Sequence, residues 1–286
     1  MGTPGSASLP TPSTPSGREG LAALLERPQQ AALVFDFDGT LSPIVPDPDQ
    51  ARAHPGAVPA LARLAPLVGS IAVLTGRPAG VAARNGGFAN VPGLERMVVL
   101  GQYGVERWDA ASGEIQAPPV PAGVAAVQAE LPALLDREGA GPGTFVEDKG
   151  RAIAVHTRRA DDPRGTFERL RAPLYALAER HGLIVEPGRL VLELRPPGMD
   201  KGVALEQYVR ESGAGAVLYA GDDLGDLAAY AAVGELRAGG LPGVLVCSAA
   251  FSGEGAEELA EQADLVVDGP QGVVALIDSL TNTLTR

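Results

Sequence analysis

Cysteine is nearly absent from this chain, and long apolar runs are missing altogether. Cys247 is the only cysteine among 286 residues, which excludes an internal disulfide. It lies in the apolar run 243–247, so we interpret it as a small buried hydrophobic residue and not as a nucleophile. No apolar stretch is long enough to span a bilayer, and no basic segment leads into an apolar one as in a secretion signal. These absences predict a soluble, cytoplasmic protein that has no membrane partner.

Basic residues are in the minority. Lys and Arg total 23 against 35 Asp and Glu, which gives a net charge of −12 and an isoelectric point of about 4.7. Because a chain of this sign repels a phosphate backbone, we expect no nucleic-acid partner. The length of 286 residues allows one large domain or two modest domains, each with its own core.

Lysine is the rarer of the two basic residues. Only Lys149 and Lys201 are lysines, which leaves 23 − 2 = 21 arginines, and Ala, Gly and Pro are abundant, as under pressure from a GC-rich genome. Under that pressure a lysine persists best where arginine cannot replace it, because the lysine ammonium is a compact charge on a slim stem and the arginine guanidinium is a broad planar fork. Both lysines are therefore candidate functional residues, with drift as the alternative for either one alone.

The most informative segment is Val34-Phe35-Asp36-Phe37-Asp38-Gly39-Thr40. The apolar run 31–35 predicts a buried strand of a parallel sheet, and residues two apart on a strand point the same way, so Asp36 and Asp38 start out side by side. Two such carboxylates repel each other and lose hydration unless a cation or a reaction needs them. A calcium-binding EF-hand loop is excluded because Gly39 comes too early and a strand precedes it. A plain turn would need only one carboxylate, so chemistry with a metal is the prediction.

Strand and helix patterns alternate along the chain. Residues 1–16 are rich in Gly, Ser, Thr and Pro and are expected to be a disordered tail. Residues 17–117 and 198–286 predict a doubly wound parallel-sheet (Rossmann-like) α/β core. Residues 118–197 read as helix, two strands, helix and two strands, which predicts an inserted α/β cap domain.

We expect the chain to act as a monomer.

Further polar motifs fall at or near the edge where the predicted core strands end, which is where doubly wound sheets hold their sites. They are Thr75-Gly76-Arg77 after strand 70–74, Lys201 before a helix, and Asp222, Asp223 and Asp226 after strand 216–220. Carboxylates at this density favour a hard cation bound through oxygen, which indicates Mg²⁺. No cluster of His and Cys ligands accompanies them, so zinc is not expected.

This order of motifs resembles the haloacid dehalogenase superfamily of phosphatases, over nearly everything after the tail. The resemblance implies that Asp36 attacks phosphorus, and that Asp38 protonates the leaving oxygen and then activates water. It implies that Thr75 and Lys201 hold the phosphoryl oxygens.

The same resemblance implies how the metal is held. Asp36, the carbonyl of Asp38, and Asp222 would bind Mg²⁺, with Asp223 and Asp226 close by. The family's last motif usually carries threonine and glutamate where Gly225 and Leu227 stand here, which puts the support around the metal in question.

Three segments of the predicted cap are informative: Phe145-Val146-Glu147-Asp148-Lys149, Ala152–Arg158 and Val191–Pro196, the last shortly before Asp200-Lys201-Gly202. Within that superfamily, these segments look like those of the trehalose-6-phosphate phosphatases. The resemblance implies that Glu147, Lys149 and Glu193 bind the distal sugar of trehalose 6-phosphate. The alternative for the first two is an exposed strand pair of little energetic value.

Other positions leave alternatives open. Gly76 and Arg77 are assigned to the substrate phosphate, although Arg77 could instead orient the phosphate loop or cap a helix. His156 matches a family histidine and is placed on the substrate side, and Tyr103 stands where the family often has histidine. The rival functions are phosphatase activity on another sugar phosphate, such as sucrose phosphate or mannosyl-phosphoglycerate, and a catalytically silent sugar-phosphate-binding regulatory domain.

Overall fold

The computed structural model describes residues 8–198, 200–249 and 256–286. The chain divides into two compact units. The first consists of Met1–Ala117 and Asp200–Arg286 and is called here the core unit; the second, Pro118–Met199, is called the cap unit.

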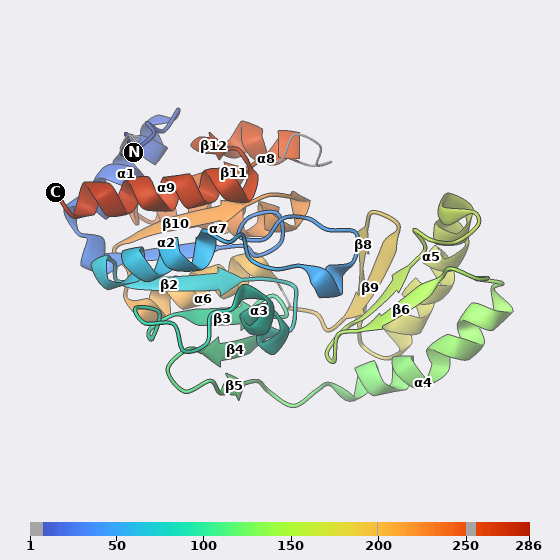
Figure 1. Ribbon diagram of the computed structural model, residues 1–286. Coiled ribbons are helices and arrows are strands. Elements are labelled where there is room, and N and C mark those ends of the chain that lie inside the picture. Colours follow the sequence, from blue (N-terminus) through green and yellow to red (C-terminus); the bar gives the residue numbers. More distant parts are fainter. Residues whose placement is uncertain (1–7, 199, 250–255) are drawn as a thin grey trace. The chain divides into compact units, whose positions relative to one another are not determined.

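An eight-stranded sheet forms the centre of the core unit (Figure 1). The strands from β12 to β3 pair in parallel, and β4 and β5 extend one edge antiparallel. The spatial order is β12 (Leu265–Val267), β11 (Gly243–Ser248), β10 (Ala216–Gly221), β1 (Ala31–Phe35), β2 (Ser70–Leu74), β3 (Val98–Gly101), β4 (Glu106–Asp109) and β5 (Ile115–Gln116).

Helices cover both faces of this sheet. One face packs against α1 (Pro15–Glu26), α2 (Ala57–Leu64), α3 (Ala79–Gly86) and α9 (Gly269–Leu284). The other packs against α6 (Lys201–Ser212), α7 (Leu227–Ala238) and α8 (Ala256–Gln262). Short 3₁₀ helices are η1 (Pro28–Gln30), η2 (Pro48–Gln50), η3 (Ala65–Leu67) and η4 (Leu224–Asp226). The predicted doubly wound core is confirmed.

Strand β1 shows why the sequence selects this arrangement. All five of its residues are buried. Leu33 and Phe35 pack into the layer of α1, α2, α3 and α9, while Ala32 and Val34 pack into the layer of α6, α7 and α8. A strand that buries both faces needs a continuous apolar run and not an alternating one.

The cap unit is a four-stranded antiparallel sheet with two helices on one face (Figure 1). The strand order is β6 (Phe145–Asp148), β7 (Ile153–His156), β9 (Val191–Arg195) and β8 (Ile184–Gly188). Helices α4 (Ala122–Arg137) and α5 (Pro163–Arg180) pack against its apolar face, which carries Ile153, Val155, Leu192 and Leu194. The opposite face of this sheet carries the polar residues of the cap unit that are predicted to bind the sugar.

The N-terminal segment differs from the expected tail of residues 1–16. Residues 1–7 lie outside the described residues, but residues 8–16 are part of the core unit. Leu9 packs against the hydrophobic core, the Ser13 N–H donates to the Asp264 carbonyl, and the Thr14 hydroxyl accepts from the Gly17 N–H at the start of α1. A threonine N-cap followed by proline is a helix-start signal, and it outweighs the polar composition.

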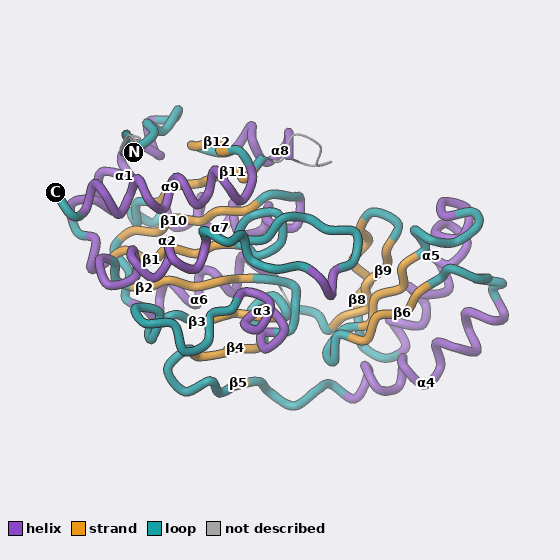
Figure 2. Tube along the Cα trace, viewed as in Figure 1, coloured by secondary structure: helices purple, strands orange, loops and turns teal. Residues whose placement is uncertain are grey.

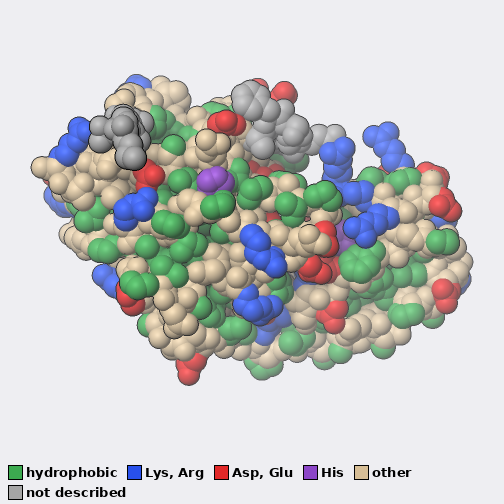
Figure 3. All heavy atoms as spheres, viewed as in Figure 1, with side chains coloured by type: hydrophobic (Ala, Val, Ile, Leu, Met, Phe, Trp, Pro, Cys, Tyr) green, Lys and Arg blue, Asp and Glu red, His purple; other side chains and the backbone are tan. Residues whose placement is uncertain are grey.

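Three further predictions and features concern burial, membrane spans and surface charge. Cys247 is buried in β11, as predicted. Among the described residues, no helix combines the length and the apolar character that a membrane span needs. On the face drawn in Figure 3, basic and acidic side chains are scattered among hydrophobic and neutral ones, so neither sign of charge dominates it.

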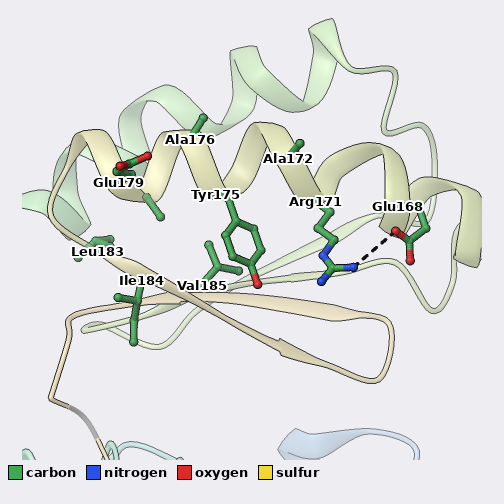
Figure 4. A pocket seen from close by; sticks show the side chains of 10 residues that line it. Glu168, Arg171, Ala172, Tyr175, Ala176, Glu179, Leu183, Ile184 and Val185 are labelled. Carbon is green, nitrogen blue, oxygen red and sulfur yellow. Dashed lines mark ion pairs between the residues drawn. The ribbon is translucent and has the colours of Figure 1, made fainter.

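A hollow of about 920 Å³ lies along α5 and the start of β8 in the cap unit (Figure 4). Tyr175 points from α5 toward Ile184 and Val185, and an ion pair of 3.9 Å joins the exposed Arg171 and Glu168 nearby. None of the predicted site residues lines this hollow.

Candidate active site

The predicted core residues gather at the carboxyl ends of β1 and β10. The sheet continues from β1 through β2 and β3 in one direction, and from β10 through β11 and β12 in the other. The topological switch therefore lies between β1 and β10, where doubly wound folds bind ligands. Asp36 and Asp38 leave β1 on one side of this point, and Asp222 leaves β10 on the other.

Three carboxylates and one lysine form the centre of this site. Oxygen atoms of Asp36, Asp222 and Asp226 all lie within 4.8 Å of one another. The ammonium of Lys201 donates to Asp36 Oδ1 at 2.8 Å and to Asp226 Oδ1 at 2.7 Å. With all three carboxylates ionised, as metal binding requires, three negative charges against one positive charge give a formal charge of −2. A divalent cation bound through carboxylate oxygens would neutralise it, so the donor set fits Mg²⁺.

The pKa values reflect this excess of negative charge. Burial raises the pKa of Asp36 well above its ordinary value, and Lys201 offsets this only in part. Burial alone would lower the pKa of Lys201, but Asp226 and Asp36 outweigh it and raise that pKa. Burial, then Asp36 and Asp223, raises the pKa of Asp222 to about 10. One lysine is shared among several carboxylates, so the site stabilises added positive charge.

Lys201 owes its position to the start of α6. The Asp200 side chain caps this helix by accepting from the N–H groups of Gly202 and Val203, at 2.7 and 3.1 Å. A Cβ atom at Gly202 would lie 2.5 Å from the Ala228 carbonyl oxygen, so glycine permits the close approach of α6 to α7. These two features aim the first residue of the helix at the carboxylates.

Asp226 is fully buried, and both of its oxygens are engaged. Oδ1 accepts from Lys201 and from the Tyr219 hydroxyl at 2.5 Å. Oδ2 accepts from the backbone N–H groups of Asp222 and Asp223, at 3.0 and 3.4 Å. Asp226 therefore holds the lysine and the turn after β10 in place, and it has less freedom to bind a metal than Asp36 or Asp222.

The turn after β1 requires glycine. Gly39 has a φ of +75°, and a Cβ there would lie 1.9 Å from Asp222 Oδ2. Its carbonyl accepts from the Ser248 hydroxyl at 2.7 Å, which ties the turn to the end of β11. The missing side chain is thus what lets Asp222 approach the β1 loop.

The Thr75-Gly76-Arg77 turn lies beside Asp38. The Thr75 hydroxyl accepts from the Arg77 N–H at 3.2 Å. The Arg77 guanidinium donates to both oxygens of Asp38, at 2.6 and 2.8 Å. A Cβ atom at Gly76 would lie 2.9 Å from the half-buried ring of Tyr103, so glycine leaves room for this ring beside the turn.

Positions that depart from the family pattern do not disrupt the turn after β10. Asp223 is exposed and caps η4, accepting from the Gly225 N–H at 2.8 Å, while Asp226 accepts from the Asp223 N–H in return. Leu227 begins α7 and packs against the core instead of offering a carboxylate.

Within the cap unit, the predicted sugar-binding residues share the polar face of the sheet. Glu147, Ala154, Glu193 and Glu186 are cross-strand neighbours in one row. Like charges in such a row are unfavourable unless cations flank them. Lys149 supplies one, donating to Glu193 Oε2 at 2.5 Å, whereas Glu193 Oε1 is buried without a hydrogen-bond partner among the described residues.

Two more pairs complete this face. His156 Nε2 lies 2.9 Å from Glu147 Oε2, and Arg195 donates to Glu186 at 3.0 Å. The exposed ring of Phe145 lies 5.9 Å from the His156 ring, between centroids. Glu147 and Lys149 are therefore not a simple exposed pair. Each is tied to another polar residue on the same face.

Sequence reasoning missed two residues of the core site, Tyr219 and Asp200. A tyrosine inside an otherwise aliphatic buried strand was the available signal, because its hydroxyl needs a partner. An aspartate directly before a lysine and a glycine, at the start of a helical pattern, was the signal for the cap.

Comparison with known proteins gives the family. The family model described as trehalose-phosphatase matches residues 34–263. The chain belongs to the trehalose-phosphatase family. The trehalose-phosphate phosphatase of Mycobacterium avium (strain 104) is 38% identical over 235 residues, 80% of this chain and 56% of that protein. That of Mycobacterium tuberculosis (strain ATCC 25618 / H37Rv) is 37% identical over 213 residues, 72% of this chain and 52% of that protein. The chain thus spans about half the length of these curated relatives.

Solved structures of the family have the same fold. The Candida albicans trehalose-6-phosphate phosphatase C-terminal domain superposes with a TM-score of 0.73 at 22% identity, covering 96% of this chain and 99% of that one. An Aspergillus fumigatus trehalose-6-phosphate phosphatase gives a TM-score of 0.64 at 24% identity, covering 96% and 99%. The chain therefore shares the fold of these structures.

Proposed function

We propose that this chain hydrolyses trehalose 6-phosphate to trehalose and phosphate, with Mg²⁺ and through an aspartyl-phosphate on Asp36. The observation that carries the proposal is the cluster of Asp36, Lys201, Asp222 and Asp226 at the topological switch. Binding alone does not require a carboxylate that is held by a lysine and placed beside a surplus of negative charge. Membership of the trehalose-phosphatase family supports the substrate.

Asp36 is the nucleophile in this proposal. Its Oδ1 is held by Lys201 at 2.8 Å, which leaves Oδ2 to attack phosphorus. The ester oxygen departs with a proton from Asp38, and Asp38 then takes a proton from the water that cleaves the acyl phosphate. Thr75, the backbone at Gly76, and Lys201 bind the phosphoryl oxygens.

Mg²⁺ would be held by Asp36, Asp222 and the backbone carbonyl of Asp38, and it would screen the charge of the phosphate from the attacking carboxylate. Asp223 belongs to the outer part of this site, since it is exposed and caps η4. For Asp226 we propose positioning of Lys201 in place of direct ligation, because both of its oxygens accept other hydrogen bonds.

The chemistry requires these elements to act together. Phosphate monoesters can need up to about 10²¹-fold acceleration, and one general acid supplies only about 10²–10⁴ of it. The remainder must come from covalent catalysis, charge neutralisation by the cation, and the fixed ammonium of Lys201.

The cap unit is proposed to recognise the sugar. Sugar hydroxyls are bound by convergent donors and acceptors, and Glu147, Lys149 and Glu193 supply both kinds on one face. The buried Oε1 of Glu193 lacks a partner within the described residues and is suited to accept from a hydroxyl.

The test is phosphate release from trehalose 6-phosphate, glucose 6-phosphate and sucrose 6-phosphate, with Mg²⁺ and with EDTA. The proposal expects a strong, Mg²⁺-dependent preference for the trehalose ester that Asp36→Asn abolishes. Glu193→Gln should raise KM for the trehalose ester, while Glu168→Gln, an exposed glutamate on α5, should leave it unchanged. A preference for another ester would refute the substrate, and release from none would favour a regulatory binding domain.

A further inference from the structure

Arg77 donates to both carboxylate oxygens of Asp38, which is the proposed acid and base. Its Nε donates to Asp38 Oδ2 at 2.6 Å, and its Nη2 donates to Asp38 Oδ1 at 2.8 Å. This is the bidentate fork that arginine forms with carboxylates, and it engages both oxygens of one group. Asp38 therefore occupies the edge of the guanidinium formed by Nε and Nη2.

The third guanidinium nitrogen reaches a different segment. Nη1 of Arg77 donates to the Pro48 carbonyl at 2.9 Å, in η2 of the loop between β1 and α2. Figure 2 shows this loop in teal with η2 as a short purple turn. The guanidinium carbon also lies 5.9 Å from the ring centre of the buried Phe37.

The backbone of Arg77 is fixed as well. Its N–H donates to the Thr75 hydroxyl, and its carbonyl accepts from the Gln102 N–H at 2.8 Å. The side chain is only 16% exposed. A long side chain that is held at its backbone, along its ring-facing surface and at all three nitrogens has little freedom to follow a substrate.

We propose that Arg77 is a positioning residue for Asp38 and not a ligand of the substrate phosphate. In the state seen here it keeps both carboxylate oxygens of Asp38 turned toward itself and joins them to the η2 loop. When an ester binds, one Asp38 oxygen leaves the fork to meet the leaving oxygen, while the other keeps its bond to Arg77. This inference rests on the proposed phosphatase function.

A residue that positions the acid and a residue that binds the phosphate can be told apart by which esters lose kcat/KM when the residue is changed. Expulsion of an alkoxide needs a proton from Asp38, whereas p-nitrophenolate leaves readily without one. Loss of Asp38 placement should therefore lower kcat/KM for alkyl esters and spare p-nitrophenyl phosphate. Loss of a phosphate ligand should lower kcat/KM for every ester by the same factor.

The experiment measures kcat/KM with Mg²⁺ for trehalose 6-phosphate, glycerol 1-phosphate and p-nitrophenyl phosphate. Arg77→Gln is compared with Asp38→Asn, which defines the profile of a missing acid. The matched control is Arg52→Gln, since the Arg52 guanidinium donates to the carbonyls of Asp49 and Ala51 in the same loop and, within the described residues, to no carboxylate. Competitive inhibition by inorganic phosphate gives a second readout, of phosphate affinity.

We expect Arg77→Gln to lower kcat/KM for both alkyl esters about 10²-fold, within the range of general acid catalysis, and to change p-nitrophenyl phosphate less than about threefold. Phosphate affinity should stay at the wild-type value, and Arg52→Gln should match the wild type on all esters. If Arg77→Gln does not fold, Arg77→Lys serves, because lysine cannot form the fork and should give a weaker form of the same profile.

Three results with Arg77→Gln would overturn the inference. Equal loss on all three esters with weaker phosphate inhibition would make Arg77 a phosphate ligand. Loss on trehalose 6-phosphate alone would make it a sugar ligand, and no loss would remove any role. A wild type that cleaves the two smaller esters but not trehalose 6-phosphate would refute the proposed substrate while leaving this comparison readable. Cleavage of none would refute both.

Discussion

Removal of one hydroxyl tests whether Asp226 is held as the structure indicates. Tyr219 is fully buried and donates to Asp226 Oδ1 at 2.5 Å. A hydrogen bond to a charged group contributes about 1.5–3 kcal/mol, and Lys201 keeps Asp226 from being left unpaired. Tyr219→Phe keeps the ring and should lower the free energy of unfolding by about 2 kcal/mol, roughly a 30-fold change in the folding equilibrium.

Tyr230 provides the matched control. Its ring packs edge-on against that of Tyr219, with centroids 6.1 Å apart, and it is equally buried. Its hydroxyl has no hydrogen-bond partner among the described residues, so Tyr230→Phe removes an unsatisfied polar atom and should be neutral or stabilising.

The assay is urea unfolding of the whole chain, followed by tryptophan fluorescence. Trp108 is the single tryptophan and lies in β4, so the signal reports on the core unit. Equal destabilisation by the two Tyr→Phe changes, or a larger loss for Tyr230→Phe, would refute the reasoning about Asp226.

Three further predictions concern the same unit. Burial raises the pKa of Asp222 to about 10, so the folded state holds a proton that the unfolded state releases, and stability in EDTA should fall as pH rises from 3.8 toward 10. Asp222→Asn should reduce both this pH dependence and the thermal stabilisation by Mg²⁺. Thermal melts in which the pH dependence is unchanged would contradict this prediction. Gly39→Ala should lower activity and stability, because φ is +75° and the new Cβ would meet Asp222, whereas Gly87→Ala, with a φ of +69° and nothing within 4 Å, should cost only about 1 kcal/mol in denaturant melts. Similar melts for both would count against the steric argument. Asp264→Ala should lower the free energy of unfolding by about 3–5 kcal/mol, because it leaves Arg237 without its buried partner, and a change below about 1 kcal/mol would show that this pair is not important.

The parallel core could be predicted because its physics is local. The run 31–35 is apolar throughout, so it had to be buried on both faces, and the aspartates after it had to lie at a strand end. Lysine scarcity pointed to Lys149 and Lys201, and each is paired with a carboxylate in its own unit.

Long-range pairing could not be predicted in the same way. Arg77 and Asp38 are 39 positions apart, and nothing in either segment says that the guanidinium binds the carboxylate and not a phosphate. Asp226 was grouped with the metal residues because it shares their motif, and nothing in that motif indicates that its Oδ1 accepts from Lys201 and Tyr219.

The N-terminal helix and the exact ends of helices were also not predicted from the sequence. Helix α1 was missed because polar composition was weighed above the cap at Thr14, whose hydroxyl also donates to the buried Asp264. A proline directly after Thr75-Gly76-Arg77 favours the first position of a helix, but α3 begins one residue later, at Ala79, and Pro78 has an extended ψ of 136°. Such shifts by one residue depend on tertiary contacts as well as on propensity.

The most direct test of the account is whether Asp36 carries the phosphoryl group during turnover. The chain would be mixed with trehalose 6-phosphate and Mg²⁺, quenched in acid within the first turnovers, reduced with borohydride and digested. The account predicts that the peptide containing residue 36 carries homoserine at that position, the product of reducing an acyl phosphate. Asp36→Asn should give no such product. Reduction at another residue, or full turnover with Asp36 never modified, would contradict the account.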